Sequence, residues 1–411
     1  MKFGLLGEHL GHSYSPQIHR ELHGLEYRLY EVPRGQVESF LNTTELEGIN
    51  VTIPYKQTVM PFCAEVSGIS RRIGCVNTLV RKPEGWYGYN TDYDGFCYML
   101  KEAGIDPAGR KVLVFGNGGA SLTARTALKD LGASEIIIIS RRLPEKNDVQ
   151  ADTYDRLFRY SDAEIVINTT PVGMYPGNGE KPADLRMFPK CKGVADVIYN
   201  PAQTALLLQA EELGIPHTGG LGMLTAQAWR SAELWLGNRI ADDRVREIRR
   251  KLEKEMQNIV LIGMPGCGKT SIGRILQEKT GRRFIDTDET VEKTTGRKIP
   301  DIIGEDGEES FRSLETKAIE NAGKESGCII ATGGGCVTKD RNYSPLHQNG
   351  RIIWIRRDLS LLPKEGRPLS RSLAAEEMYA ARKDLYASFS DIVLDNDTTL
   401  EEAADRIMEQ L

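Results

Sequence analysis

The sequence predicts an α/β protein with two nucleotide-binding units, each built on a parallel sheet. Short β-branched runs alternate with helical stretches along the chain, which is the pattern of parallel sheets covered by helices. Two of these runs, at 111–115 and 258–262, lead directly into a glycine-rich turn and then a helix. Between the two units, eleven of the seventeen residues from 241 to 257 are charged, so we expect a linker helix there.

The individual elements follow from apolar runs and from helical periodicity. The expected strands are Lys111–Phe115, Glu135–Ile139, Glu164–Asn168, Gly193–Ile198, Asn258–Ile262, Cys328–Ala331 and Arg351–Ile355. The expected helices after the glycine-rich turns are Leu122–Leu131 and Ser271–Lys279. In the linker, Val245, Ile248, Leu252 and Met256 recur at helical spacing. The other residues carry charges of both signs, which favours a solvated connector over a helix that binds an acidic partner.

Composition places the chain among soluble globular proteins. It has 411 residues, 40% hydrophobic and 27% charged, with a formal net charge of −5. The negative charge argues against nucleic-acid binding, and no apolar run approaches the ~20 residues of a membrane-spanning helix. The seven cysteines show no C-x-x-C spacing, so we expect reduced thiols and a cytoplasmic protein. His19 and His23 have the spacing of a metal-binding pair, but the sequence offers no third ligand.

The C-terminal unit begins with a phosphate-binding loop. Residues 263–270 read Gly-Met-Pro-Gly-Cys-Gly-Lys-Thr between a strand and a helix, which matches G-x-x-x-x-G-K-S/T in its required setting. Glycines let backbone N–H groups turn inward around phosphate oxygens. Lys269 is placed to reach the β- and γ-phosphates, and the Thr270 hydroxyl is placed to bind Mg²⁺. The motif predicts a nucleoside triphosphate but leaves the acceptor open.

Downstream residues indicate a small, hydroxylated, anionic acceptor. Asp286 and Asp288 end a short apolar run, and the two-residue period of a strand predicts that both carboxylates lie on one face. Further polar motifs follow at Gly307–Arg312, Glu315, Thr332–Gly335, Gly366–Leu369, Arg382 and Tyr386. Arginine suits a carboxylate because its planar guanidinium donates two parallel hydrogen bonds.

The order of these motifs over residues 258–411 resembles shikimate kinase and disfavours other small P-loop kinases, such as gluconate or nucleoside monophosphate kinases. The resemblance implies transfer of the γ-phosphate of ATP to the 3-hydroxyl of shikimate, with Mg²⁺ bound by Thr270 and Asp286. Lys269, Asp288 and Arg367 would be catalytic. ATP would contact Gly263, Gly266, Cys267, Gly268, Lys269, Thr270, Ser271 and Arg367, and shikimate would contact Asp288, Arg312, Gly334, Gly335 and Arg382. A short lid would lie between Arg367 and Arg382.

The N-terminal unit carries a dinucleotide-binding turn. Residues 116–121 read Gly-Asn-Gly-Gly-Ala-Ser between the strand at 111–115 and a helix, which is the order of a dinucleotide-binding crossover. The next strand ends at Ser140, Arg141 and Arg142, without the acid that binds a ribose 2′-hydroxyl. Arginines suit a 2′-phosphate, so NADP is favoured over NAD.

The first hundred residues are rich in hydroxyl and amide side chains at the ends of apolar runs. The motifs are Gly11–Pro16, Asn50–Lys56, Gly74–Thr78 and Gly88–Asp92. Together they offer hydroxyls, amides, one lysine and one aspartate, which suits a polyhydroxy acid that exchanges a proton. Thr52 and Asn77 are also residue types that cap turns without any further role.

These motifs, with Asn168–Met174, Asp196–Pro201 and Gly222–Gln227, resemble shikimate dehydrogenase from residue 1 to about 238, although Cys75 replaces the alanine usual in that family. The resemblance implies a two-lobed dehydrogenase: a substrate lobe at about 1–95 with returning helices at about 222–240, and a Rossmann-like NADP lobe at about 96–221. Lys56 and Asp92 would be the catalytic pair. Substrate would contact Ser13, Ser15, Thr52, Asn77, Asn90, Tyr199 and Gln227, and NADP(H) would contact Gly116, Gly118, Gly119, Ala120, Ser140, Arg141, Arg142, Thr169, Gly222 and Met223.

Together the two resemblances imply a bifunctional enzyme of aromatic amino acid biosynthesis, with a dehydrogenase at 1–240, a linker helix at 241–257 and a kinase at 258–411. The first unit would reduce 3-dehydroshikimate to shikimate with NADPH, and the second would phosphorylate shikimate with ATP. The alternative is a regulatory protein whose degenerate enzyme domains sense shikimate or a nucleotide. The presence of Lys56, Asp92, Lys269 and Asp288 disfavours it. The expected partners are these small molecules, and the oligomeric state is left open.

Overall fold

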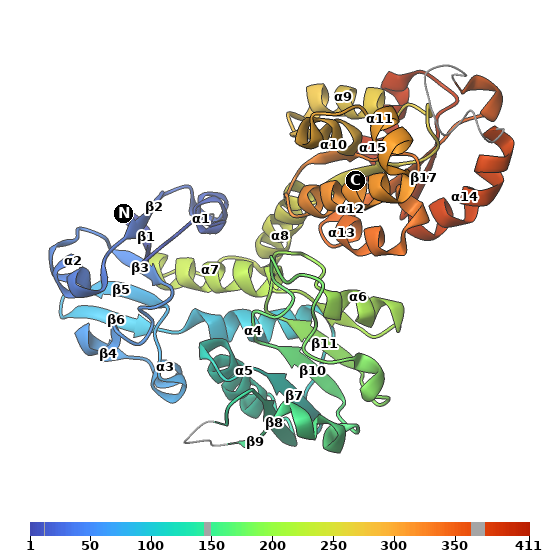
Figure 1. The fold of residues 1–411 in the computed structure, drawn as a ribbon. Helices are drawn as coiled ribbons and strands as arrows, with labels where there is room; N and C mark the ends of the chain where they lie inside the picture. The colour runs from blue at the N-terminus through green and yellow to red at the C-terminus, as the bar shows by residue number, and fades with distance from the viewer. Residues whose placement is uncertain (12, 144–148, 363–374) are drawn as a thin grey trace. The chain divides into compact units, whose positions relative to one another are not determined.

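The computed structural model describes residues 1–11, 13–143, 149–362 and 375–411. The chain divides into two units, Met1–Lys251 and Leu252–Leu411, and each is an α/β structure (Figure 1). The predicted fold class is confirmed by three sheets that are wholly or partly parallel. Arg367 and the segment 363–374, which includes the first half of the predicted lid, lie outside the described residues. Within the described ranges, no helix is long and apolar enough to cross a membrane.

The first sheet of the N-terminal unit is mixed. Its strands are β1 (Lys2–Gly7), β2 (Glu26–Glu31), β3 (Gly48–Val51), β4 (Cys63–Val66), β5 (Thr78–Lys82) and β6 (Gly85–Tyr89), in the order β2-β1-β3-β5-β6-β4. Helices α1 (Ser15–His23), α2 (Val37–Thr43) and α3 (Gly68–Ile73) belong to the same lobe. Because β5 is antiparallel to both β3 and β6, β3 and β6 run in the same direction and end at the same edge of the sheet.

The second sheet of this unit is parallel throughout. Its strands are β7 (Lys111–Phe115), β8 (Glu135–Ile139), β9 (Gln150–Asp152), β10 (Ile165–Asn168), β11 (Gly193–Asp196) and β12 (His217–Thr218), in the order β12-β11-β10-β7-β8-β9. Helix α5 (Gly119–Asp130) connects β7 to β8, and helix α6 (Ala205–Glu212) connects β11 to β12. This order is that of doubly wound dinucleotide-binding sheets, which bind ligands where β7 and β10 diverge.

Two helices, α4 (Thr91–Glu102) and α7 (Leu221–Leu236), pack against each other between the two sheets (Figure 1). Their close approach requires Gly95, because a β-carbon there would lie 2.6 Å from the Met223 carbonyl oxygen and 3.2 Å from the Gln227 nitrogen. The contact places Gln227 of α7 beside α4, the helix whose first turn contains Asp92.

Helix α8 (Asp242–Met256) occupies the predicted linker. All four residues of its apolar stripe are buried. In its first half, Val245 packs with Tyr98 of α4, and Arg246 pairs with Glu102 at 3.1 Å. The first half of α8 is therefore part of the packing of the N-terminal unit.

The C-terminal unit has one parallel five-stranded sheet. Its strands are β13 (Asn258–Ile262), β14 (Phe284–Asp286), β15 (Ile329–Ala331), β16 (Gly350–Arg356) and β17 (Ile392–Asp395), in the order β14-β15-β13-β16-β17. Its helices are α9 (Lys269–Thr280), α10 (Thr287–Thr295), α11 (Ile299–Asp306), α12 (Glu308–Gly323), α13 (Tyr343–His347), α14 (Ala375–Phe389) and α15 (Leu400–Gln410). The central strand β13 leads directly into the phosphate-binding loop, so the loop lies at the carboxyl edge of the sheet, between neighbouring strand ends.

Candidate active sites

Lys56 and Asp92 meet at the edge where β3 and β6 end. Lys56 lies in the turns after β3, and Asp92 lies in the first turn of α4, directly after β6. The Lys56 Nζ donates to Asp92 Oδ2 at 2.6 Å, and the side chains are 30% and 16% exposed. The fold thus joins the two residues predicted as a catalytic pair and leaves both within reach of a ligand.

The ion pair determines the charge of the lysine. Burial lowers the pKa of Lys56, but the charge and hydrogen bond of Asp92 outweigh burial, so the pKa is raised above that of an ordinary lysine. Lys56 is therefore an ammonium at neutral pH and can donate a proton to a ketone oxygen. Burial raises the pKa of the neighbouring Cys75 thiol, so the cysteine found in place of alanine is neutral.

Two predicted substrate ligands, Asn90 and Asn77, make hydrogen bonds within the protein. Asn90 caps α4: its Oδ1 accepts from the Tyr93 N–H at 3.2 Å, and its Nδ2 donates to the Cys75 carbonyl at 3.2 Å. Asn77 Oδ1 accepts from the Thr91 N–H at 2.7 Å, and its Nδ2 donates to Thr91 Oγ1 at 3.1 Å. Among the described residues Asn77 Nδ2 has no other acceptor, which leaves one N–H for a ligand. The role of Asn90 as a substrate ligand stays a prediction.

The remaining predicted substrate ligands come from four segments. Thr52 is half-buried on the same turn as Lys56, and Gln227 lies on α7. Ser13 Oγ accepts from the Ser15 N–H at 3.2 Å where α1 begins. Tyr199 packs its ring edge against Tyr14, with centroids 6.2 Å apart. No hydrogen bond of the described residues joins Ser13, Ser15 or Tyr199 to the Lys56–Asp92 pair.

In sheets of this order a dinucleotide binds in the crevice beside strands placed like β7 and β10. Gly116 directly follows β7 with a φ of 106°, and a β-carbon there would lie 2.8 Å from Thr169 Oγ1. Beyond it, α5 begins at Gly119, and β-carbons at Gly118 and Gly119 would meet no atom within 4 Å. An open space beside a helix N-terminus, with backbone N–H groups directed into it, suits a pyrophosphate.

The residues predicted to read the 2′-phosphate lie after β8, the strand beside β7. Ser140 Oγ donates to the Arg142 carbonyl at 2.6 Å, which fixes the turn. Arg141 and Arg142 are both exposed. This is the strand end at which such folds bind the adenosine ribose, so the position of both arginines fits a 2′-phosphate.

A buried carboxylate holds the loops that follow β10 and β11. Asp196 accepts from Asn168 Nδ2 at 3.1 Å, from the Thr204 hydroxyl at 2.8 Å and from the Ile198 N–H at 3.0 Å. Burial raises the pKa of Asp196 to about 6 despite these donors. The two loops carry Thr169 and the Tyr199 segment, so this carboxylate orders residues on both sides of the crevice.

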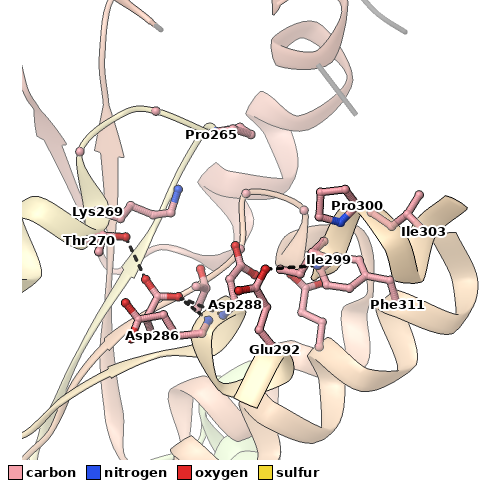
Figure 2. Close-up of a pocket in the computed structure, with 18 of the residues that line it drawn as sticks. Pro265, Lys269, Thr270, Asp286, Asp288, Glu292, Ile299, Pro300, Ile303 and Phe311 are labelled. Carbon is pink, nitrogen blue, oxygen red and sulfur yellow. Dashed lines mark hydrogen bonds between the residues drawn. The ribbon is translucent and has the colours of Figure 1, made fainter. Parts of the chain in front are cut away.

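In the C-terminal unit, the phosphate-binding loop borders a cavity of about 790 Å³. Gly263, Gly266 and Gly268 all have positive φ values, as the inward turn of the loop requires. The Lys269 Nζ donates to the carbonyls of Gly263 and Met264 at 2.9 and 3.0 Å. Figure 2 shows Lys269 and Thr270 on one side of Asp286 and Asp288, with Ile299, Pro300 and Phe311 on the other.

The prediction that Asp286 and Asp288 share one face of a strand is wrong. Asp286 ends β14, and Asp288 lies in the first turn of α10. Asp286 is the cap of that helix: its Oδ1 accepts from the N–H groups of Asp288 and Glu289, at 3.0 and 3.2 Å. Its Oδ2 accepts from the Thr270 hydroxyl at 2.9 Å (Figure 2). Two oxygen donors thus lie together beside the loop, which fits the hard-oxygen preference of Mg²⁺.

A second buried carboxylate, Glu315, lies beside Asp288. A β-carbon on Gly333 would lie 2.3 Å from Glu315 Oε1 and 2.7 Å from Asp288 Oδ1. Neither oxygen has a hydrogen-bond partner among the described residues. Burial, then repulsion by Glu315, raises the pKa of Asp288 to about 7. These unpaired oxygens border the cavity and fit hydroxyl groups of a ligand.

Arg312 and Arg382, the two arginines predicted to bind the substrate carboxylate, have different hydrogen-bond partners. Arg312 is buried and donates to Glu315 at 2.8 Å and to Glu308 at 2.9 Å. Arg382 Nη1 donates to the Gly334 carbonyl at 3.1 Å, and the Tyr386 hydroxyl donates to the same oxygen. Arg312 and Arg382 both line the cavity. Arg312, however, is mainly engaged in ion pairs with carboxylates of the protein.

Sequence reasoning missed three residues on which this geometry depends. The role of Glu315 is not evident from the sequence, because Asp288, the carboxylate that it faces, lies on another helix, α10. Gly333 belongs to a run of three glycines, and sequence alone does not show which one faces the carboxylates. Asn50 belongs to the motif Asn50–Lys56, whose sequence gives it no role of its own, yet it is 5% exposed and hydrogen-bonds to several elements.

Comparisons with known proteins identify both units. The family model of the shikimate dehydrogenase substrate binding domain matches residues 5–79, and that of shikimate kinase matches residues 265–411. The chain is similar to an NADP(+) shikimate dehydrogenase of Clostridium perfringens: 35% identical over 266 residues, 61% of this chain and 98% of that protein.

Solved structures agree with this match. A chorismate mutase/shikimate 5-dehydrogenase fusion protein from Clostridium acetobutylicum is 39% identical, with a TM-score of 0.59 over 61% of this chain and 97% of that chain. Shikimate 5-dehydrogenase from Thermus thermophilus, in complex with NADP(H) and shikimate, is 29% identical, with a TM-score of 0.54 over 61% of this chain and 99% of that chain. The chain therefore belongs to the shikimate dehydrogenase family and carries a shikimate kinase domain as its C-terminal unit.

Proposed function

We propose that the chain is a bifunctional enzyme of the shikimate pathway. Its N-terminal unit reduces 3-dehydroshikimate to shikimate with NADPH, and its C-terminal unit phosphorylates shikimate with ATP and Mg²⁺. The observation that supports the proposal is that each unit brings several of its predicted reactive groups together. The Lys56–Asp92 pair is formed, and Lys269, Thr270, Asp286 and Asp288 border one cavity.

In the dehydrogenase, NADPH supplies the hydride when bound. Lys56 donates its ammonium proton to the ketone oxygen as that oxygen becomes a hydroxyl, and the same lysine accepts the proton in the reverse direction. Asp92 keeps Lys56 charged and oriented through the 2.6 Å bond. The remaining N–H of Asn77 and the Gln227 amide bind substrate hydroxyls. Exposed Arg141 and Arg142 bind the 2′-phosphate.

In the kinase, ATP with Mg²⁺ supplies the phosphoryl group when bound. Backbone N–H groups of residues 263–270 bind the phosphates, and Lys269 exchanges its loop carbonyls for phosphate oxygens. Thr270 and Asp286 hold the metal ion. The unpaired oxygen of Asp288 accepts a hydrogen bond from the reacting hydroxyl, and Arg312 with Arg382 binds the carboxylate of shikimate.

Single substitutions in the full-length chain test the assignment of one activity to each unit. Lys269→Met should abolish formation of shikimate 3-phosphate and leave NADPH oxidation at the wild-type rate, because the hydrogen bonds of Lys269 among the described residues stay within the phosphate-binding loop. Lys56→Ala should do the reverse. The proposal is wrong if either substitution abolishes both activities in a protein that remains folded.

A further inference from the structure

A buried hydrogen-bond network in the N-terminal unit is centred on Asn50. The Asn50 amide contacts four elements: Oδ1 accepts from Tyr27 of β2 at 2.9 Å and lies 3.0 Å from His19 Nε2 of α1. Its Nδ2 donates to Thr78 of β5 at 3.1 Å and to Ser231 of α7 at 2.8 Å. Asn50, His19, Thr78 and Ser231 are all buried, so each bond replaces one that water would otherwise make.

The backbone N–H of Leu25 determines which nitrogen of His23 and of His19 carries the hydrogen. The Leu25 N–H donates to His23 Nδ1, so His23 carries its own hydrogen on Nε2 and donates it to His19 Nδ1 at 3.2 Å. His19 therefore carries its hydrogen on Nε2 and donates to Asn50 Oδ1. Burial lowers the pKa of His19 to about 3, so both its nitrogens keep these roles at neutral pH. His19 and His23, which have the spacing of a metal-binding pair, are thus hydrogen-bonded to each other.

From Asn50, further hydrogen bonds lead through Thr78 and Ser231 to predicted substrate-binding residues. Because the Asn50 amide donates to both hydroxyls, Thr78 and Ser231 each keep their own hydrogen for a further bond. Ser231 Oγ donates to the Gln227 carbonyl at 2.9 Å, and Thr78 Oγ1 donates to Asn77 Oδ1 at 3.2 Å. The network therefore ends on two of the residues that we propose bind substrate.

A third branch reaches the catalytic pair. Asn77 Oδ1 also accepts from the N–H of Thr91, and the Thr91 hydroxyl lies 3.0 Å from Thr78 Oγ1 and 3.1 Å from Ser231 Oγ. Thr91 precedes Asp92 in the first turn of α4. The Thr78 hydroxyl is thus the point where strand β5, helix α4 and helix α7 are joined, although Ser231 of α7 lies 153 residues further along the chain.

We infer that Thr78 and Asn50 are positioning residues for the dehydrogenase: their network sets the register of α4 and α7 against the sheet and thereby places Asn77, Asp92 and Gln227 around the substrate. The inference rests on the proposed function. Neither residue touches the ion pair. Displacement of catalytic groups by about 1 Å costs about 100-fold in rate, so small shifts of the two helices are expected to reduce turnover before they unfold the protein.

Isosteric variants of Thr78 in the full-length chain test this inference. Thr78→Val keeps the shape but removes the hydroxyl, and we expect kcat/KM for shikimate oxidation to fall by ~10- to 100-fold. The KM for NADP⁺ should change less than kcat/KM, since Arg141, Arg142 and the glycine-rich turn after β7 lie in the other lobe. Thr78→Ser restores the hydroxyl and should recover most of the activity. Kinase activity of the same chain serves as the internal control.

Thr126→Val is the matched control. The Thr126 hydroxyl is also buried but donates only to the Leu122 carbonyl of its own helix, at 2.8 Å, so this variant should keep wild-type kinetics. If Thr78→Val does not fold, Ser231→Ala is measured in its place with the same expectation. Wild-type kinetics in the folded Thr78→Val or Ser231→Ala variant would overturn the inference, as would an equal loss in Thr126→Val or failure of serine to rescue.

The histidine tautomers test the network without any turnover. Nitrogen NMR of the wild-type chain should show His19 and His23 as neutral Nε2–H tautomers from pH 7 to 8, and protonation or the opposite tautomer of either ring in that range would contradict the network. Absence of shikimate oxidation in the wild type, with these tautomers observed, would overturn the proposed function and leave the described hydrogen bonds intact.

Discussion

Substitution of Gly333 by alanine should disable the kinase while leaving the dehydrogenase intact. The added β-carbon would lie 2.3 Å from Glu315 Oε1 and 2.7 Å from Asp288 Oδ1, whereas ordinary contacts begin near 3.4 Å. At least one carboxylate must therefore retreat by about 1 Å, and such a displacement costs about 100-fold in rate. We expect kcat/KM for shikimate phosphorylation to fall by that order. Both activities are measured on the same full-length protein, with NADPH absorbance and with ADP release.

The matched control for this substitution is Gly304→Ala. Gly304 is exposed on α11 of the same unit, and a β-carbon there would meet no atom within 4 Å. Alanine is favoured over glycine in a helix by about 1 kcal/mol, so this variant should keep kinase activity and gain stability. Wild-type kinase activity in Gly333→Ala, or an equal loss in Gly304→Ala, would refute the argument that the glycine makes room for the two carboxylates.

Three further predictions follow from the sites. Alanine at both Arg141 and Arg142 should raise the KM for NADPH much more than that for NADH, by ~10-fold or more per lost charge-assisted contact; equal effects would show that they do not bind the 2′-phosphate. Asp196 has a raised pKa of about 6, so its contribution to stability is full below the unfolded pKa near 4 and is lost as pH rises through about 6. Between pH 4 and 7 the free energy of unfolding, measured by urea titration, should fall by about 3 kcal/mol less in Asp196→Asn than in the wild type. An equal fall in the two proteins would contradict this pKa. Chelation of Mg²⁺ should stop the kinase but not the dehydrogenase, and Thr270→Val should raise the Mg²⁺ concentration for half-maximal activity; an unaltered Mg²⁺ requirement would exclude Thr270 as a ligand.

Sequence reasoning predicted the parts of the fold whose signals are local. The strand–turn–helix patterns at 111–121 and 258–270 are contained within a few residues, and the structure has strands and helices at both. The six strands before residue 100 were not predicted individually, because they pair in a mixed sheet whose order depends on contacts between distant segments.

The chemistry at the sites was predictable by residue type more than by geometry. The sequence identified Asp286 and Asp288 as site residues but did not predict their arrangement. The strand ends at Asp286 because the side chain of this residue caps α10. The role of Glu315 depends on its burial beside Asp288, which no sequence pattern expresses. Asn50 has a partner 181 residues away, and a hydrogen bond of that range leaves no local signal.

The most direct test of the central claim is a coupled assay on the intact chain. With 3-dehydroshikimate, NADPH, ATP and Mg²⁺, the account predicts accumulation of shikimate 3-phosphate, with one NADPH oxidised and one ADP formed for each molecule of product. Omission of ATP should stop the reaction at shikimate, and omission of NADPH should prevent both steps. Binding of these ligands without turnover would contradict the account and favour a regulatory protein built from enzyme domains.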